Sequence, residues 1–240
     1  QERISLGESI QICGNGTTGE IQSKSSKEKQ SLLISTRALK AIHFFDPDDL
    51  VAGMEAGQTA MEVQKLLAQK KMQLAINPWY PHSTLGGMVS TNISGPNRMN
   101  MGGLRDCVLG IEYINGLGEI VKAGGKVVKN VSGYDLTRML LGSKGGFGVI
   151  TSVTFKVIPL PLEPFGMYGI FENETWLSKV KELHKRRIPL DWVQGVSTND
   201  SKWILGLGYS GNFYNRKRIE NEIIRIFGDS LTILRDGESF

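Results

Sequence analysis

Three short segments concentrate glycine and hydroxyl side chains in a pattern that suits phosphate binding. The runs are GNGTT, HSTLGG and NISG, and the second and third lie close together. Glycine leaves backbone N–H groups open to an anion, and hydroxyls add neutral donors. These runs predict a diphosphate held from two sides. The residues are Gly14, Asn15, Gly16, Thr17 and Thr18, then His82, Ser83, Thr84, Leu85, Gly86 and Gly87, then Asn92, Ser94 and Gly95.

The run from Gly14 to Gly19 also matches the G-x-G-x-x-G pattern of dinucleotide-binding folds. In those folds a helix begins inside the motif, so that its N-terminus meets the pyrophosphate. Residues 20–30 contain a single apolar residue, Ile21, and no stripe that a helix could bury. The sequence therefore argues against a Rossmann site. A tight turn between strands remains open as the alternative interpretation of this segment.

The composition indicates a folded domain without metal or nucleic-acid chemistry. Glycine accounts for 29 of the 240 residues, the hydrophobic fraction is 40%, and the net charge of +4 is spread along the chain. Such a charge mildly favours an anionic ligand. No apolar run approaches the ~18 residues of a membrane helix. Cys13 and Cys107 lack C-x-x-C spacing, which argues against a zinc ribbon or an iron–sulfur cluster. We expect no metal site, no nucleic-acid partner and a cytoplasmic protein that is not transmembrane.

Strands dominate the region up to residue 160. The pattern predicts a helix after a capping box formed by Thr59 and Glu62, with Met61, Leu66 and Leu67 facing inward. A second helix is expected over 134–141. The expected strands are 10–13, 32–35, 41–45, 50–56, 73–76 and 149–158, with a hairpin of 110–115 and 119–122. This pattern indicates an α+β domain rather than a doubly wound parallel sheet.

A second region follows the prolines Pro159, Pro161 and Pro164, which we interpret as a domain boundary. Its pattern predicts the order β-α-β-β-α-β, the ferredoxin-like split motif. The expected strands are 166–171, 191–197, 203–209 and 230–234, and the expected helices are 176–187 and 214–227. The sequence therefore predicts two domains, 1–160 and 165–240.

Six motifs of the first region occur in the order typical of one flavoprotein family. They are GxGT at 14–17, TLGG at 84–87, NxSG at 92–95, RDxVLG at 105–110, KNVxGYDL at 129–136 and GSxGxxGVIT at 142–151. Over nearly all of residues 8–160, the chain resembles the FAD-binding domain of the vanillyl-alcohol oxidase / p-cresol methylhydroxylase (PCMH) family. Within that family it is most similar to the FAD-binding E subunits of bacterial glycolate oxidases.

The resemblance implies a PCMH-type domain of two α+β subdomains around FAD, followed by a cap domain. It implies that residues 14–18 and 84–87 hold the pyrophosphate. It also implies that Ser94 and Gly95, together with Gly148, Val149 and Ile150, line the flavin and adenosine ends. Many relatives attach FAD covalently through a histidine in the first segment or a cysteine near the second. Because residues 14–18 contain no histidine, we expect non-covalent FAD. His82 is either close to the flavin or an exposed loop histidine.

The resemblance further implies the FAD-binding subunit of a glycolate-type 2-hydroxy-acid oxidoreductase. Its expected partners are a second flavoprotein subunit and an iron–sulfur subunit, which would attach it peripherally to the inner membrane. Oxidation also needs a base near the substrate hydroxyl. The sequence identifies no such catalytic residue, and the second region contains one histidine, His184. Two alternatives remain open: a self-sufficient FAD-dependent dehydrogenase, and an accessory subunit without productive flavin.

Overall fold

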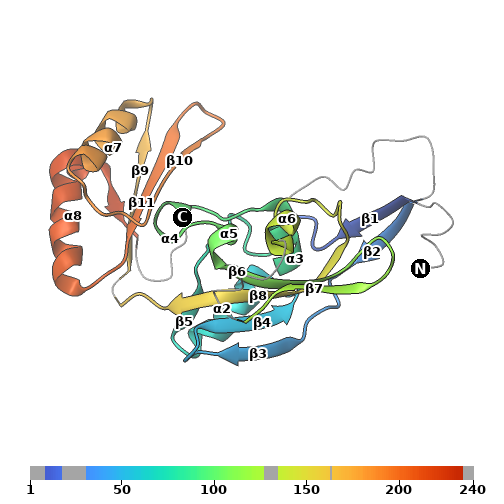
Figure 1. Cartoon of the computed structure of the whole chain (residues 1–240). Coiled ribbons are helices and arrows are strands. Elements are labelled where there is room, and N and C mark those ends of the chain that lie inside the picture. The colour runs from blue at the N-terminus through green and yellow to red at the C-terminus, as the bar shows by residue number, and fades with distance from the viewer. Residues whose placement is uncertain (1–8, 18–30, 127–134, 163, 235–240) are drawn as a thin grey trace. The chain divides into compact units, whose positions relative to one another are not determined.

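One long strand, β8 (Val149–Pro159), lies at the centre of the main sheet, since it pairs with other strands along both edges. Its alternate side chains Val153, Phe155 and Val157 are buried. In the computed structural model this sheet has the order β3-β4-β8-β6-β7, and β5 pairs separately with β8 (Figure 1). All of these pairs are antiparallel. The other strands are β3 (Ile42–Asp46), β4 (Val51–Glu55), β5 (Met72–Leu74), β6 (Val108–Ile114) and β7 (Ile120–Gly124).

The structure describes residues 9–17, 31–126, 135–162 and 164–234. The chain divides into two compact units. Unit 1 contains residues 1–95 and 102–160, and unit 2 contains residues 96–101 and 161–240. The α+β class predicted from the strand-rich pattern is confirmed.

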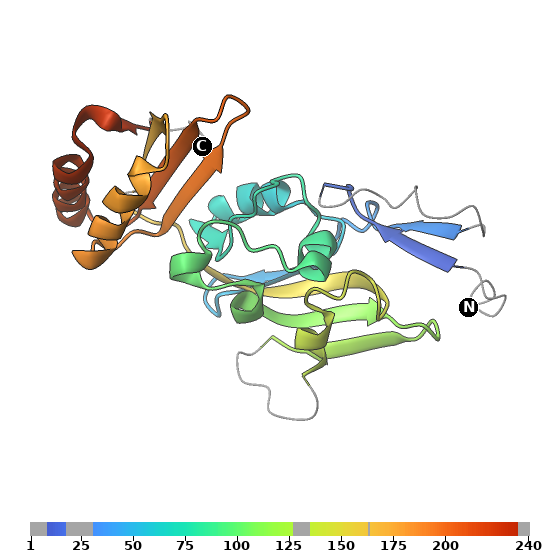
Figure 2. The same ribbon diagram turned by 90° about the horizontal axis from the view of Figure 1, so that it is seen from above.

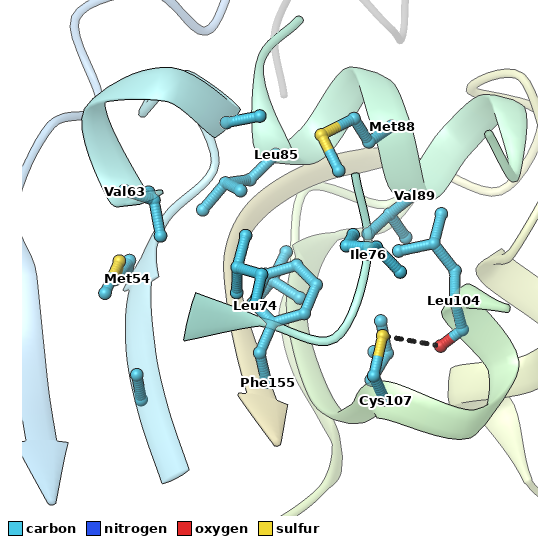
Figure 3. Close-up of a cluster of buried hydrophobic side chains, with 14 of the residues drawn as sticks. Met54, Val63, Leu74, Ile76, Leu85, Met88, Val89, Leu104, Cys107 and Phe155 are labelled. Atoms are coloured by element: carbon cyan, nitrogen blue, oxygen red, sulfur yellow. Dashed lines mark hydrogen bonds between the residues drawn. The ribbon is translucent and has the colours of Figure 1, made fainter. Parts of the chain in front are cut away.

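Four helices contribute buried side chains to the core of unit 1. They are α2 (Ala60–Ala68), α3 (Leu85–Thr91), α5 (Leu104–Cys107) and α6 (Leu136–Leu140). Side chains from α2, α3 and α5 surround Phe155 of β8 in one apolar cluster (Figure 3). This packing fixes α3 against the sheet.

Helix α2 begins with the predicted capping box. The Thr59 hydroxyl accepts the Glu62 N–H at 3.2 Å, and the Glu62 carboxylate accepts the Thr59 N–H at 2.7 Å. Its inward face differs from the prediction. Ala60, Val63 and Leu67 are the buried residues, whereas Met61 and Leu66 are half-buried. The helix therefore presents the 60, 63, 67 stripe of i, i+3 and i+4 spacing to the core.

Strands β1 (Ser9–Cys13) and β2 (Ser31–Ser35) form a separate parallel pair in unit 1. Ile10 lies opposite Leu32, and Ile12 lies opposite Ile34. Just beyond the pair, the Thr36 N–H donates to the Cys13 carbonyl at 3.0 Å. This pairing sets the position at which the GNGTT segment leaves β1.

Unit 2 has the element order β-α-β-β-α-β. Its sheet is antiparallel with the order β10-β11-β9-β12, and α7 and α8 pack on one face (Figure 2). The elements are β9 (Phe165–Phe171), α7 (Thr175–Lys185), β10 (Trp192–Ser197), β11 (Trp203–Tyr209), α8 (Phe213–Phe227) and β12 (Thr232–Ile233). Within the described ranges no helix has both the length and the apolar character needed to cross a bilayer.

A segment expected in the first domain belongs to unit 2. Residues 96–101, which we call the arm, contain the short helix α4 (Arg98–Met101). The Asn100 side-chain amide donates to Asp191 Oδ1 at 2.7 Å, and the other Asp191 oxygen accepts from the Ser210 hydroxyl. A composition-based boundary at 159–164 could not predict the arm, because its attachment depends on a contact between residues 91 positions apart. Independent folding of 1–160 and 165–240 stays a prediction.

Candidate functional site: a glycine- and hydroxyl-lined cavity

A cavity of about 570 Å³ lies in unit 1, where β1, its following loop, helix α3 and the start of β8 meet. This volume is within the range of about 300–1,000 Å³ usual for small-molecule and cofactor sites. The cavity is lined by Ile10, Gln11, Ile12, Cys13, Gly14, Asn15, Gly16, Thr17, Leu33, Thr36, Thr84, Gly86, Gly87, Ser90, Thr91, Lys144, Gly145, Gly148 and Ile150.

The structure brings the first two predicted segments together. The Asn15 side-chain amide donates to the His82 carbonyl at 2.8 Å, and the Thr17 and Ser83 hydroxyls lie 2.7 Å apart. These contacts join residues 66 and 67 positions apart in the sequence. The two segments therefore form one wall of the cavity.

Gly14 allows this wall to close. A Cβ at position 14 would lie 2.1 Å from Thr84 Oγ1, so only a glycine lets the chain approach Thr84 this closely. Gly16 has φ +69°, a conformation that favours glycine. Arg37 Nε donates to the Gly14 carbonyl at 3.1 Å, so this carbonyl has a partner within the protein.

Helix α3, which the sequence did not predict, forms a second wall. Thr84 is its N-cap, and its cavity face consists of Gly86, Gly87, Ser90 and Thr91. The Gly86 N–H donates to the Ala56 carbonyl at 2.9 Å, and the Gly87 N–H donates to Thr84 Oγ1 at 3.2 Å. The expectation that these two amides face an anion is therefore wrong. The glycines instead leave the helix face bare, so that a ligand can lie against its backbone.

The third wall comes from the segment that enters β8. Lys144, Gly145, Gly148 and Ile150 line it. Gly148 has φ +144°, and a Cβ there would lie 2.1 Å from the Ile114 carbonyl oxygen. This close approach brings the start of β8 against the end of β6 and fixes the neighbouring cavity wall.

Apolar side chains gather on the side formed by the parallel pair. Ile10 and Ile12 of β1 and Leu33 of β2 line the cavity there. The glycine and hydroxyl walls suit phosphate oxygens, whereas these side chains suit an apolar ring. The cavity can therefore hold a ligand that combines phosphate and ring systems.

Several predicted residues lie elsewhere. Leu85 is fully buried in the core, and Asn92 ends α3 with φ +55°. Ser94 is buried and accepts the Leu104 N–H at 3.1 Å, while Gly95 packs against the Asn77 carbonyl. These four residues build the fold around α3 and do not line the cavity, so their contact with FAD stays a prediction.

The remaining predicted residues divide into three cases. His82 has an exposed side chain and contributes its carbonyl to the wall, as described above. Val149 pairs with Ile114 in the sheet without lining the cavity, next to Ile150, which does line it. Thr18 lies outside the described residues, as do residues 129–134 of the KNVxGYDL motif.

The sequence did not predict Ser90, Thr91, Lys144 or the lining residues of β1 and β2. Ser90 and Thr91 lie four positions after Gly86 and Gly87, on the same helical face. Recognising Thr84 as an N-cap residue would have placed them there. Nothing local in the sequence indicates the contribution of β1 and β2, since it depends on their parallel pairing.

The two cysteines are buried and do not form a disulfide with one another. Burial raises the pKa of the Cys107 thiol to about 12, and this thiol points at the Leu104 carbonyl in the core (Figure 3). Cys107 is therefore an unreactive core residue. Among the described residues, no group of three or more His, Cys, Asp or Glu side chains is placed to hold a metal ion.

Fold and cavity together define a protein that binds a phosphorylated, ring-containing cofactor. Comparison with known families makes this specific. Residues 5–124 match the FAD binding domain family, half of the chain, and the chain belongs to this family. FAD binding, expected from the motifs, is thereby supported at the level of the family.

Curated relatives match between about half and two thirds of the chain. Glycolate oxidase subunit GlcE of Escherichia coli is 33% identical over 161 residues, covering 65% of this chain and 45% of the relative. Glycolate oxidase subunit GlcD of Bacillus subtilis is 30% identical, covering 59% and 30%. A D-lactate dehydrogenase of Archaeoglobus fulgidus is 32% identical, covering 55% and 29%. The chain thus spans less than half the length of these relatives.

The fold extends over both units in a solved structure. An alkyldihydroxyacetonephosphate synthase has a TM-score of 0.77 and 16% identity, covering 97% of this chain and 49% of that chain. At this identity the similarity concerns the fold alone. It is consistent with the PCMH-type architecture expected from the motifs.

Proposed function

We propose that this chain is the FAD-carrying part of an oxidoreductase that acts on small 2-hydroxy acids such as glycolate. The observation that carries this proposal is the cavity of unit 1, in which residues 14–17 and helix α3 form adjoining walls. The names of the similar glycolate oxidase subunits and D-lactate dehydrogenases support the substrate class.

The donor set of the cavity fits FAD. Asn15, Thr17, Ser90 and Thr91 provide neutral polar groups, and the bare faces of Gly86 and Gly87 admit a phosphate close to the backbone. The side chains Ile10, Ile12 and Leu33 provide the apolar surface that a ring requires. We propose that the first three walls hold the diphosphate and that the parallel pair holds a ring of the cofactor.

When bound, FAD supplies the acceptor for the hydride removed from the substrate carbon. The described residues of unit 1 bind and orient it, because their hydrogen bonds fix the cavity walls in place. The Asn15–His82 and Thr17–Ser83 contacts keep the two segments at a constant separation. Buried Ser83 and Thr84 are held by the same wall, so that water has little access behind it.

We further propose that FAD is bound without a covalent bond. The described residues of the first segment, Gly14–Thr17, contain no histidine. Cys13 lines the cavity, but its thiol donates to the Gly14 carbonyl at 3.1 Å and is buried. Acid precipitation should therefore leave all yellow colour in the supernatant. Flavin retained in the pellet would contradict non-covalent binding.

We propose that substrate oxidation requires partner chains, which would be a second flavoprotein subunit and an iron–sulfur subunit. Support comes from the word "subunit" in the names of the two glycolate oxidase relatives and from the lack of an identifiable base among the described cavity-lining residues. Attachment to the inner membrane through these partners belongs to the same proposal.

Anaerobic mixing with glycolate and D-lactate, followed by the flavin absorbance, tests this function. The isolated chain should hold oxidised FAD and be reduced slowly, and addition of the partner chains should make reduction fast. Rapid reduction of the isolated chain would favour a self-sufficient dehydrogenase. A chain that folds but takes up no FAD would favour an accessory subunit.

A further inference from the structure

Lys144 stands out among the residues that line the cavity. It is the one lining residue with a formal charge at neutral pH among those that the structure describes, and no Asp or Glu is part of the lining. The other polar contributions come from hydroxyls, amides and backbone groups. Among these described lining residues, a bound anion would therefore meet one cation and otherwise neutral groups.

The backbone holds Lys144 at this place. Its φ is +51°, which is uncommon for a residue with a side chain, and its N–H donates to the Ser90 carbonyl at 2.8 Å. Gly142 and Gly145 on either side also have positive φ, +80° and +83°. An uncommon conformation held by a defined hydrogen bond is the kind of feature that marks a functional position.

The hydrogen bond to the Ser90 carbonyl places Lys144 within reach of the cavity walls that we propose to hold the diphosphate. Ser90 lies four residues after Gly86 on α3, about one helical turn or ~5.4 Å along the axis. A four-carbon lysine side chain can span that distance. Arg37 is another cation near the first segment, but it donates to the Gly14 carbonyl and does not line the cavity.

We infer that Lys144 pairs with the FAD diphosphate and thereby makes the cavity select phosphorylated cofactors over riboflavin. This inference rests on the assignment of the cavity to FAD. A lysine ammonium binds phosphate as a point charge, and a charge-assisted hydrogen bond is about twice as strong as a neutral one. Because Lys144 is exposed, salt will screen part of the attraction.

The test compares Kd values of three probes on the flavin-free 240-residue chain: FAD, ADP and riboflavin. Lys144→Ala should weaken FAD and ADP by about fivefold at low salt, because an exposed charge pair contributes up to about 1 kcal/mol. Riboflavin, which has no phosphate, should bind unchanged. Lys144→Glu should weaken FAD further, and Lys144→Arg should restore most of the affinity.

Salt and a matched lysine provide the controls. The FAD affinity of the unsubstituted chain should fall with added sodium chloride more steeply than that of Lys144→Ala. Lys65→Ala removes an exposed lysine of α2 that does not line the cavity and should leave all three Kd values unchanged.

The outcomes separate this inference from the proposed function. If the unsubstituted chain binds no FAD, the cofactor assignment fails, and the inference fails with it. If it binds FAD and Lys144→Ala binds FAD equally well, the inference alone is overturned. Equal weakening of FAD and riboflavin would also overturn it, since that result indicates general damage to the cavity.

Discussion

Replacing Gly14 by alanine tests how the cavity wall is built. The new Cβ would lie 2.1 Å from Thr84 Oγ1 and 3.1 Å from Thr84 Cγ2. Overpacking of this kind typically destabilises a protein by about 1–3 kcal/mol. Thr84 cannot move freely, because its Oγ1 accepts the Gly87 N–H as the N-cap of α3. We expect Gly14→Ala to lower the free energy of unfolding by about 2 kcal/mol and to weaken FAD binding.

A second substitution isolates the contact. Thr84→Ala alone should cost about 1 kcal/mol through the lost cap. In the double variant the clashing Oγ1 and Cγ2 are gone, and the nearest remaining Thr84 atom, its Cβ, lies at 3.2 Å. The loss in free energy of unfolding should therefore be smaller in the double variant than the sum of the two single losses, by about 1–2 kcal/mol.

Urea unfolding followed by far-ultraviolet circular dichroism measures the four free energies, and flavin fluorescence measures the Kd for FAD. Gly116→Ala is the matched control, since a Cβ there has no neighbour within 4 Å. It should change neither quantity. Additive effects of Gly14→Ala and Thr84→Ala would refute the close approach of Gly14 to Thr84.

Three further predictions concern other parts of unit 1. Lys40 and the Thr59 N–H lower the pKa of Glu62 to about 2, so its stabilising contribution is complete above the ordinary value of 4.5 and is lost as pH falls from there toward 2. Glu62→Gln should lower the free energy of unfolding by at most about 1 kcal/mol at pH 7, because the Lys40 and Glu62 side chains are both close to half exposed. This difference from the unsubstituted chain should vanish as the pH approaches the pKa of Glu62 in the folded protein. A difference in urea unfolding that does not change with pH would argue against it. In a Cys13→Ser background, a maleimide should label Cys107 only after unfolding, and rapid labelling of the folded chain would show that the thiol is accessible. The Gly86→Val variant should lose FAD, because its Cβ would lie 3.0 Å from the Ala56 Cβ and would displace α3. Full flavin content after purification would contradict this.

The sequence predicted most strands because their signals are local. Alternation of apolar residues located β8 and β11, and the pair Thr59 and Glu62 located the start of α2. In unit 2 the apolar spacing predicts one face of α8 formed by Ile219, Ile223, Ile226 and Phe227. All of these except the half-buried Ile226 are buried. Each of these elements buries one face, and apolar residues therefore recur in its sequence at the period of the helix or strand.

Helix α3 was missed because glycine lowers helix propensity, and two glycines at positions 86 and 87 look like a loop. Tertiary packing overrides this, since Leu85, Met88 and Val89 bury the opposite face. The same error led to the wrong role for the glycine amides. The sequence pointed to segments that contribute to the cavity lining, but their mutual contacts depend on pairs such as Asn15 and His82, which no local pattern reveals.

The arm has a topological consequence for any attempt to divide the protein. The chain passes from one unit to the other at 95/96, returns at 101/102 and passes again at 160/161. A cut at Pro161 therefore yields a larger fragment that carries the arm and a smaller one that has lost it. Within the intact chain, Asn100 binds Asp191 as an intramolecular ligand, at an effective concentration that tethering raises to the order of millimolar. The separated fragments should recognise each other through the same six residues, so that cleavage alone does not make them independent.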